Sequence, residues 1–558
     1  MDFKKLADLL FPNITTTADD YLANMKPRNL GAGAEVTRIA PSPTGYLHIG
    51  TVYGAFIDKL IAKDGGVFYM RLEDTDNKRE VKNAGTIAYD MLSYFGLRPD
   101  EGYCGDEKEQ VGDYGDYIQS KRKDMYAAFA KKLVAEGKAF PCFCEKAESK
   151  DDILERRKQQ LDDEADIVAH DPCRDLTFEQ IEENLKQNKP FAIRLRSTGN
   201  AENTVKICDL IKGEREIREN EKDVVILKSD GIPPYALAHV VDDTLMGTTV
   251  VVRGEEWYPS LNVHIELFKA YGLQPPKYAH TPVICKIDED GNKRKLSKRK
   301  DKEADARYFV EQGYTVDSVM EYLLNLINSD FEDWRKQNPD KNFWEFPFSV
   351  SKIGSNNPMF DFVKLGDVAK NVISKYPAEK IYEQTCTWAN EFNKDFYDII
   401  KDKKEYCLQL FSIDRTGDKP RKDISKWSDI PVLYDYMFKD SDETQLSEFD
   451  FDEKVANADK VAVLKEYLKT YDETDEKQTW FDKIKAICEP LGFSADMKAY
   501  RKNPEMFKGS VADVSGVVRV AVTKRRMSPD LYEICKLLGK ENVKRRIENV
   551  ISLLNKGE

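Results

Sequence analysis

The sequence predicts an α/β fold in the first half of the chain and an all-α fold in the second half. Between residues 36 and 138, apolar strand-like segments alternate with helical segments, a pattern typical of a parallel β-sheet. Strands resume at residues 224–227 and 248–253 and close this sheet domain, so the charged, helical interval 139–221 is predicted to be an insertion. Beyond about residue 310, apolar residues recur at helical spacing, which predicts helices throughout.

Length and composition fit a soluble protein of several domains. The chain has 558 residues, of which 41% are hydrophobic and 33% are charged. It lacks any run of roughly 18 apolar residues, the length that a membrane helix needs, and its N-terminus does not resemble a signal peptide. Ten dispersed cysteines indicate a reducing, cytoplasmic compartment. The net charge of −13 argues against a general nucleic-acid coat and leaves RNA binding to local clusters such as 293–300, 524–526 and 544–546.

A motif early in the chain has the pattern of an anion-binding site. Apolar residues at 36–40 predict a strand end, the Pro- and Gly-rich segment 41–45 predicts an irregular turn, and a helix follows from His48. The free amides and the dipole of a helix N-terminus attract phosphate. Gly50 would let a flat ring approach the backbone, and His48 could donate a hydrogen bond to a phosphate. Taken alone, a histidine at a helix end is more often a cap or a core residue than a ligand-binding group.

A second motif is strongly basic. Lys293-Arg-Lys-Leu-Ser-Lys-Arg-Lys300 follows a polar turn at 288–292, which predicts a flexible loop. Alone, such a run fits a solvated loop or an RNA-binding patch. Lys295 and Lys298 are cationic donors on long stems, which suits them to close over a triphosphate.

Together, the two motifs resemble the paired signature of class I aminoacyl-tRNA synthetases. Five blocks are similar, in order and spacing, to glutamyl-tRNA synthetases of the bacterial type. These blocks are residues 40–45, 71–76, 227–231, 240–247 and 253–257. The resemblance spans residues 38 to about 310, roughly half of the chain, and it is looser in the C-terminal part, where residues 358–373 lack an expected tryptophan and asparagine.

The resemblance implies a class I catalytic domain with a Rossmann-type parallel sheet, an inserted acceptor-binding domain and an all-α anticodon-binding region. The implied segments are an N-terminal extension (1–34), the first half of the catalytic domain (35–138), the inserted acceptor-end domain (139–221), the second half with the lysine loop (222–320), a stem-contact region (321–385) and the helical anticodon-binding region (386–558).

The resemblance also implies a reaction. ATP, with Mg²⁺, would activate L-glutamate to glutamyl-adenylate, and the glutamyl group would then pass to the terminal adenosine of tRNA(Glu). We expect a monomer without membrane association. The implied catalytic residues are His48, Lys295 and Lys298, and the implied ATP-binding residues are His48, Gly50, Thr51, Ser297, Lys298 and Arg299. Whether tRNA(Gln) is also charged depends on anticodon contacts in the loosely matched region.

The glutamate side chain needs a cationic partner, because a buried carboxylate is costly without one. Arg38 and Arg253 match the family's two arginines, although a structural ion pair of Arg253 with Glu255 or Glu256 is the alternative. By the same resemblance, Glu73 would hold the substrate's amino group, Ala40 and Ser42 would line the pocket, Tyr235 and Trp257 would form its walls, and His239 would stand in place of an asparagine. Glutaminyl enzymes usually lack an arginine at the position of Arg253, so the pattern favours glutamate.

A cysteine cluster in the inserted segment raises the question of structural zinc. Some glutamyl enzymes bind zinc here through Cys-x-Cys followed by Cys-x-His. Cys142, Cys144 and Cys173 match three of these ligands, and the fourth would be His170 or Asp175. The alternative is a set of inert cysteines left from a lost site.

Three other functions fit the sequence less well than a synthetase. Relatives that glutamylate a modified tRNA base are short, whereas this chain continues for some 250 residues past the lysine loop. A non-catalytic paralogue would be expected to lose His48, Lys298 or Arg253, and all three are present. A generic nucleotidyltransferase would not carry the matching blocks around Glu73 and Trp257.

Overall fold

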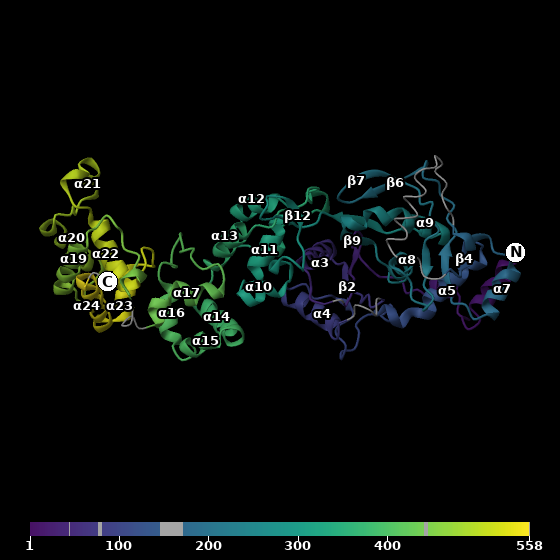
Figure 1. Cartoon of the computed structure of the whole chain (residues 1–558), viewed down its shortest axis with the longest axis horizontal. Helices are drawn as coiled ribbons and strands as arrows, with labels where there is room; N and C mark the ends of the chain where they lie inside the picture. Colours follow the sequence, from purple (N-terminus) through teal and green to yellow (C-terminus); the bar gives the residue numbers. More distant parts are fainter. Residues whose placement is uncertain (44, 76–80, 145–170, 440–444, 557–558) are drawn as a thin grey trace. The chain divides into compact units, whose positions relative to one another are not determined.

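The structure is a computed structural model that describes residues 1–43, 45–75, 81–144, 171–439 and 445–556. The chain divides into two compact units. The N-terminal unit comprises residues 1–308 and 323–361, and the C-terminal unit comprises residues 309–322 and 362–558 (Figure 1). The domain boundaries given above remain predictions.

Parallel strands form the centre of the N-terminal unit, as predicted, and they belong to two sheets, one of order β1-β2-β3 and one that contains β9 and β10. These strands are β1 (Val36–Ile39), β2 (Val67–Met70), β3 (Glu101–Gly102), β9 (Val250–Gly254) and β10 (Lys277–Thr281). Strand β2 pairs in parallel with β1 and β3, and β9 pairs in parallel with β10. Strands β1 and β9 lie side by side, where the Thr249 amide donates to the Val36 carbonyl at 3.0 Å. The chain therefore brings both halves of the predicted catalytic domain into one sheet region.

Helices connect these parallel strands, as the crossover rule requires. They are α3 (Ile49–Ala62), α4 (Ala84–Tyr94), α8 (Tyr235–Leu245) and α9 (Leu261–Tyr271). Helix α3 links β1 to β2 and buries its apolar face, which includes Val52, Phe56 and Leu60. Since parallel strands end at the same edge of a sheet, the segments that follow β1, β9 and β10 meet there.

The inserted segment is richer in strands than the sequence suggested. It contains β4 (Ala139–Cys142), β5 (Ala192–Leu195), β6 (Thr204–Asp209), β7 (Gly213–Arg218) and the helix α7 (Phe178–Lys186). Strand β8 (Val225–Leu227), which we expected to close the parallel sheet, pairs instead with β5 in an antiparallel sheet of order β4-β5-β8. A short apolar run does not specify its partner strand, and this explains the wrong prediction.

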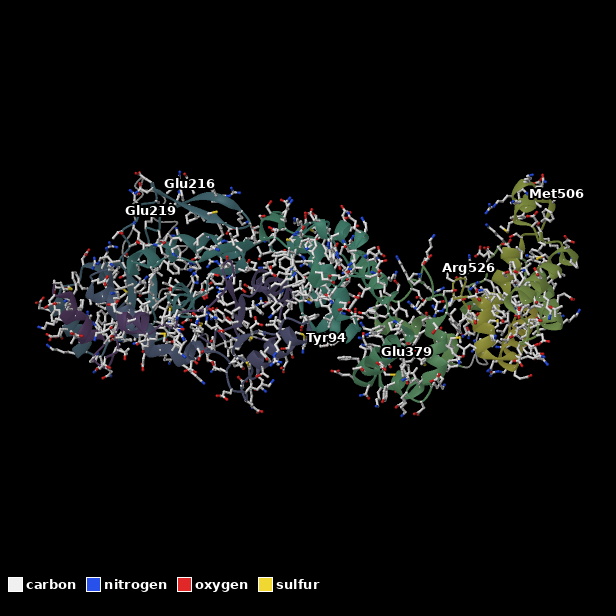
Figure 2. The ribbon with its side chains drawn as sticks, turned by 180° about the vertical axis from the view of Figure 1, so that it is seen from behind. Tyr94, Glu216, Glu219, Glu379, Met506 and Arg526 are labelled. Atoms are coloured by element: carbon white, nitrogen blue, oxygen red, sulfur yellow. The ribbon has the colours of Figure 1, made fainter. Side chains whose placement is uncertain are left out.

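The β6–β7 hairpin is hard to predict from the sequence because its strands carry many charged residues. Lys206 faces Glu216 across the pair, and Ile207 faces Arg215. Opposite charges on adjacent strands stabilise a hairpin even where both faces are wet. Figure 2 shows Glu216 at the surface of this hairpin, and β6 joins the edge of the parallel sheet through β10.

The basic motif also has regular structure. Strands β11 (Cys285–Ile287) and β12 (Lys293–Lys295) form an antiparallel hairpin around the polar turn at 288–292. Leu296 is buried directly after β12 and anchors the segment that carries Ser297 and Lys298. The predicted flexible loop is therefore a hairpin with a short extension.

The two helices within residues 1–34, α1 (Phe3–Leu10) and α2 (Ala18–Ala23), pack on α5 (Lys123–Ala135). Leu6 and Leu10 join the core that also holds Phe129. The other short elements of the N-terminal unit are η1 (Gln119–Arg122), η2 (Pro172–Asp175), η3 (Glu255–Ser260), η4 (Lys302–Ala304), α12 (Asp330–Gln337), η5 (Phe343–Glu345) and η6 (Val350–Lys352).

Helices make up every named element of the C-terminal unit, as predicted. Residues 309–322 of this unit come from α10 (Arg307–Gln312) and α11 (Val316–Ile327). The α-helices that follow are α13 (Phe362–Ile373), α14 (Ala378–Phe392), α15 (Lys394–Ile400), α16 (Lys404–Ser412), α17 (Ile430–Leu433), α18 (Asp435–Phe438), α19 (Asn457–Thr470), α20 (Lys477–Cys488), α21 (Met497–Lys502), α22 (Val511–Thr523), α23 (Leu531–Leu538) and α24 (Lys540–Lys556). Short 3₁₀ turns lie between them: η7 (Trp427–Asp429), η8 (Leu446–Glu448), η9 (Glu489–Leu491) and η10 (Pro504–Met506). Among the described residues, no helix has both the length and the apolar character needed to cross a membrane.

Candidate active site

A cavity of about 420 Å³ opens at the edge where the parallel strands of the N-terminal unit end. Its walls come from the segments that follow β1, β9 and β10 and from the first turns of α3. The predicted site residues that line it are Arg38, Ala40, Ser42, His48, Gly50, Thr51, Glu73, Tyr235, Arg253, Trp257 and Lys295. Ligands commonly bind at this edge of an α/β sheet, so the location fits a substrate pocket.

His48 caps α3 at one side of the cavity. Its Nδ1 accepts the Gly50 amide at 2.9 Å. A Cβ atom at position 50 would lie only 2.9 Å from that nitrogen, so glycine is needed for this cap. Burial, together with the nearby charge of Lys298, lowers the pKa of His48 to about 4. The ring is therefore neutral at pH 7, and its other nitrogen carries a proton, for which the Leu296 backbone is a partner in this structure.

The lysines of the basic motif contact protein groups in this structure. Lys295 pairs with Glu256 at 2.7 Å, and Lys298 donates to the carbonyl of Tyr46. The Asp301 carboxylate holds the segment between them, because it accepts two bonds from Arg294 and one from the Ser297 amide.

Of this motif, only Lys295 lines the cavity; Ser297, Lys298 and Arg299 lie outside its walls. Lys298 is nevertheless tied to the turn directly before His48 through the Tyr46 carbonyl. A bound triphosphate would have to replace the partners that both lysines now have.

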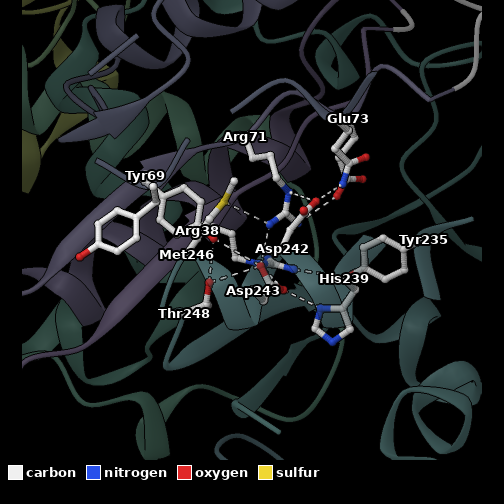
Figure 3. Close-up of polar contacts among 12 residues, drawn as sticks. Arg38, Tyr69, Arg71, Glu73, Tyr235, His239, Asp242, Asp243, Met246 and Thr248 are labelled. Carbon is white, nitrogen blue, oxygen red and sulfur yellow. Dashed lines mark hydrogen bonds and ion pairs between the residues drawn. The ribbon is translucent and has the colours of Figure 1, made fainter. Parts of the chain in front are cut away.

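Arg38 reaches the opposite side of the cavity from β1. Its guanidinium contacts the Asp243 carboxylate at 3.3 Å and the Tyr235 hydroxyl at 3.2 Å. Arg71 lies 2.7 Å from the same Asp243. Burial alone would raise the pKa of Asp243, but the two arginines outweigh it and hold that pKa well below its usual range. Figure 3 shows both arginines converging on Asp243, which therefore stays ionised and fixes Arg38.

Glu73 and the two aromatic residues complete this side of the pocket. Glu73 pairs with Arg71 at 3.3 Å, and burial raises the pKa of its carboxyl group. The Tyr235 and Trp257 rings lie with their centroids 4.6 Å apart and form an apolar wall. The structure thus brings the predicted carboxylate, arginine and aromatic groups to one end of the cavity.

Arg253 enters the cavity from the end of β9 and does not pair with the neighbouring acids. Glu255 pairs with Lys212 at 2.9 Å, and Glu256 pairs with Lys295. The alternative of a structural ion pair for Arg253 is therefore not what the structure shows. Its described partners are His280, His264 and the Tyr235 hydroxyl, at 2.9, 3.2 and 3.4 Å.

His239 lies behind the pocket rather than in its wall. The side chain is fully buried, and both ring nitrogens have partners: Asp243 at 2.5 Å and the Tyr278 hydroxyl at 2.9 Å. Its ring stacks on Tyr235 at 5.4 Å (Figure 3 labels both). The direct glutamate contact predicted for His239 is therefore not supported, because this imidazole has no face open to the cavity.

Sequence reasoning missed several wall residues. Asp58 and Tyr53, both on α3, line the cavity and are buried. Burial raises the pKa of Asp58 well above its usual range. In the sequence, an aspartate inside a helical segment gives no sign that it lines a cavity. Glu256, by contrast, lies within a quoted block and could have been included as the partner of a lysine.

The cysteines of the inserted segment converge. Cys142, Cys144, Cys173 and Asp171 place one donor atom each within 4.8 Å of one another. Three sulfurs and one carboxylate oxygen are a donor set that zinc accepts. The two candidates for a fourth ligand differ from this group: His170 lies outside the described residues, and the exposed Asp175 pairs with Arg196 at 3.4 Å.

The basic cluster at 524–526 in the C-terminal unit is paired with acids. Lys524 contacts Glu448, Arg525 contacts Asp435 and Arg526 contacts Asp450, each at 3.0 Å. Figure 2 shows Arg526 at the surface of this unit. Any phosphate that binds here would compete with three carboxylates.

Family models match both units of the chain. The model described as the catalytic domain of class I tRNA synthetases (E and Q) matches residues 35–335, and the model described as an anticodon binding domain matches residues 412–551. The glutamate–tRNA ligase of Acetivibrio thermocellus is 45% identical over 99% of this chain and 100% of that protein. The glutamate–tRNA ligase of Clostridium perfringens strain SM101 is 41% identical over the same shares.

Solved structures agree on the fold. The crystal structure of a glutamate tRNA ligase from Elizabethkingia meningosepticum, in complex with its amino acid, is similar with a TM-score of 0.71 and 23% identity, over 93% of this chain and 99% of that chain. Glutamate-tRNA synthetase from Elizabethkingia anophelis gives a TM-score of 0.70 at 23% identity, over 93% and 100%. With a catalytic-domain model spanning residues 35–335 and relatives at 41–45% identity over nearly its whole length, the chain belongs to the glutamyl-tRNA synthetase family of class I aminoacyl-tRNA synthetases.

Proposed function

We propose that the chain is a glutamate–tRNA ligase that uses the cavity of the N-terminal unit for both of its steps. The glutamate carboxylate attacks the α-phosphorus of ATP and forms glutamyl-adenylate and pyrophosphate. The 2′-hydroxyl of the terminal adenosine of tRNA(Glu) then attacks the carbonyl carbon of the adenylate, and AMP leaves. The observation that carries the proposal is one cavity with two arginines at one end and a neutral histidine on a helix N-terminus at the other.

Glutamate fits the end of the cavity with the arginines. Arg38 and Arg253 would neutralise the side-chain carboxylate, and Glu73 would accept hydrogen bonds from the amino group. Tyr235 and Trp257 would enclose the apolar part of the substrate. This arrangement presents the α-carboxylate toward α3, where the phosphates are proposed to lie.

ATP, entering as its Mg²⁺ complex, fits the α3 end. The amides of the first turn and the protonated nitrogen of His48 can donate to phosphate oxygens. Lys295 and Lys298 would exchange Glu256 and the Tyr46 carbonyl for the triphosphate. The chemistry needs aligned reactants and compensation of growing negative charge more than it needs a protein acid or base.

Two assays test the proposal together. ATP–pyrophosphate exchange should depend on glutamate and on added tRNA, and charging assays should show transfer to purified tRNA(Glu). Running tRNA(Gln) in parallel answers whether that tRNA is also charged. Exchange with another amino acid in place of glutamate would refute the assignment.

We also propose that the enzyme acts as a monomer in the cytoplasm. All ten cysteines are free thiols, as expected in a reducing compartment. Light scattering should give a mass near 64.1 kDa.

We expect stoichiometric zinc in protein purified without chelator, held by Cys142, Cys144, Cys173 and Asp171. Zinc bound there would tie together a segment that is rich in charge, and so add to its stability. Elemental analysis measures the metal. Cys144→Ser should lose it, whereas Cys208→Ser, which changes an exposed cysteine outside the group, should keep it. Zinc-free protein with normal charging activity would show that these cysteines are packing residues and not metal ligands.

We expect tRNA binding to weaken steeply with salt, although the chain carries a net charge of −13. Local lysines and arginines displace counterions from phosphates, and a footprint of several phosphates loses roughly 10³-fold in affinity between about 50 and 200 mM salt. Fluorescence anisotropy with labelled tRNA(Glu) measures the slope. Affinity that does not change with salt would contradict this prediction.

A further inference from the structure

Three of the five histidines of the chain gather behind the arginine end of the cavity. His239 comes from α8, His264 from α9 and His280 from β10, and each is almost completely buried. The His239 and His264 rings lie 4.8 Å apart. Buried imidazoles in direct contact with an arginine call for an explanation, because a charged imidazole there would repel the guanidinium.

Two of these histidines accept hydrogen bonds from Arg253 through ring nitrogens that carry no proton. The Arg253 Nε–H donates to His280 Nε2 at 2.9 Å, and an Nη1–H donates to His264 Nδ1 at 3.2 Å. Arginine has donors only, so both of these nitrogens must lack a proton. Each histidine is therefore neutral and in one defined tautomer.

Asp209 sets the tautomer of His280. Its Oδ2 lies 2.6 Å from His280 Nδ1 and accepts the proton of that nitrogen, which leaves Nε2 bare for Arg253. The other carboxylate oxygen, Oδ1, accepts the amides of Ile211 and Lys212, each at 2.9 Å. Asp209 is thus fixed by the turn after β6, and it orients the histidine on β10.

The charges around this cluster keep the imidazoles neutral. Burial is the largest cause that lowers the pKa of each imidazole, to about 4 for His239. The charge of Arg253 lowers the pKa of His264 and of His280 further, after the effect of His239 on His264 and against the raising effect of Asp209 on His280. The groups that face His264 are His239, His280, Asp243, Tyr235 and Arg253; those that face His280 are Asp209, Lys212, Tyr258, Tyr278 and Arg253. The bare nitrogens therefore persist at neutral pH and are lost only as the pH falls through these lowered values.

One nitrogen of Arg253 remains for a ligand. Among the described residues, the buried Nη2 has no hydrogen-bond partner, while Arg253 itself lines the cavity. Nε and Nη1 are held from behind, so the free Nη2 has little freedom to move. A buried donor of this kind calls for an acceptor, and the substrate carboxylate supplies one.

We propose that His264, His280 and Asp209 are positioning residues for amino-acid selection: two neutral imidazoles hold Arg253 so that its Nη2 meets the side-chain carboxylate of glutamate. The inference rests on the proposed function. Selectivity for glutamate would then depend on the tautomer of His280, and hence on the Asp209 carboxylate, which contacts neither glutamate nor ATP.

Asp209→Asn tests the tautomer directly. Asparagine would keep its oxygen on the two backbone amides and turn its NH₂ group toward His280, which reverses the proton pattern of that ring and points an N–H at Arg253. We expect the KM for glutamate to rise about 10-fold or more, with the KM for ATP unchanged. ATP–pyrophosphate exchange with tRNA present measures both constants.

His280→Gln provides the matched control. A glutamine oxygen can occupy the place of Nε2 and accept from Arg253 without help from Asp209. The double variant Asp209→Asn/His280→Gln should therefore regain most of the affinity for glutamate that Asp209→Asn loses. Similarly, His264→Asn should retain an acceptor near Nδ1 and bind glutamate better than His264→Leu.

The outcomes are distinguishable from a failure of the proposed function. Unmodified protein that does not activate glutamate would refute the function itself. Unmodified protein that activates glutamate, combined with an unchanged KM in Asp209→Asn, would overturn only the positioning role. Equal losses in kcat and in both KM values, with a lowered Tm and no recovery in the double variant, would also overturn it, since they indicate a structural role alone.

Discussion

Arg253→Ala is expected to lower kcat/KM for glutamate by roughly 10³-fold, the effect of leaving a buried charge without its partner. The carboxylate would then enter a pocket whose walls include Glu73 and Glu256, with Arg38 as the remaining arginine of its lining. Arg38 is already bound to Asp243 at 3.3 Å and compensates poorly for the loss. ATP contacts lie at the α3 end, so the KM for ATP should change little. Steady-state ATP–pyrophosphate exchange with tRNA gives both constants.

The comparison needs two further variants. Arg215→Ala removes an exposed arginine of β7 that does not line the cavity, and it should leave both constants unchanged. Arg253→Lys keeps the charge but does not offer the planar donors that meet His264 and His280, so most of the loss should remain. If Arg253→Ala folded normally and kept its apparent affinity for glutamate, the carboxylate would have to be bound elsewhere.

Much of the pocket could be predicted from the sequence because its residues lie in short blocks next to strand ends. Arg38 and Arg253 lie near the ends of β1 and β9, and His48 caps α3, so the family resemblance together with these local patterns predicts that they meet. A buried carboxylate needs a cationic partner, and this requirement agrees with the two arginines that the resemblance indicates.

The layer behind the pocket could not be predicted in the same way. His239, His264 and His280 lie on three separate elements, and nothing local links them to Arg253. The family resemblance places His239 in the pocket, at a position where an asparagine is expected, yet its side chain faces Asp243 and Tyr278. Sequence position gives the element that carries a residue, whereas tertiary packing decides which face of that element a ligand meets.

Strand pairing shows a similar limit. The run that became β8 was apolar and short, which is compatible with a parallel or an antiparallel sheet, and the structure pairs it with β5. The β6–β7 hairpin was hidden because cross-strand ion pairs such as Lys206 with Glu216 replace the usual alternation of apolar and polar residues.

Lys298→Ala is expected to slow adenylate formation by roughly 10²-fold or more while leaving the fold intact. The exposed side chain donates to the Tyr46 carbonyl, so removing it costs one surface hydrogen bond. In the transition state, however, its charge would lie against phosphates that gain negative charge, next to the neutral His48 that supplies no positive charge of its own. The rate should therefore fall much more than the affinity for ATP.

Lys300→Ala is the matched control for this loss, because it removes an exposed lysine two positions away on the same segment. It should leave the exchange rate near that of the unmodified protein, whereas a general effect of loop charge would slow both variants alike. Single-turnover formation of glutamyl-adenylate, measured with tRNA present, separates chemistry from product release. Near-normal rates in Lys298→Ala would remove this lysine from the site and leave Lys295, which already lines the cavity, as the cation that meets the triphosphate.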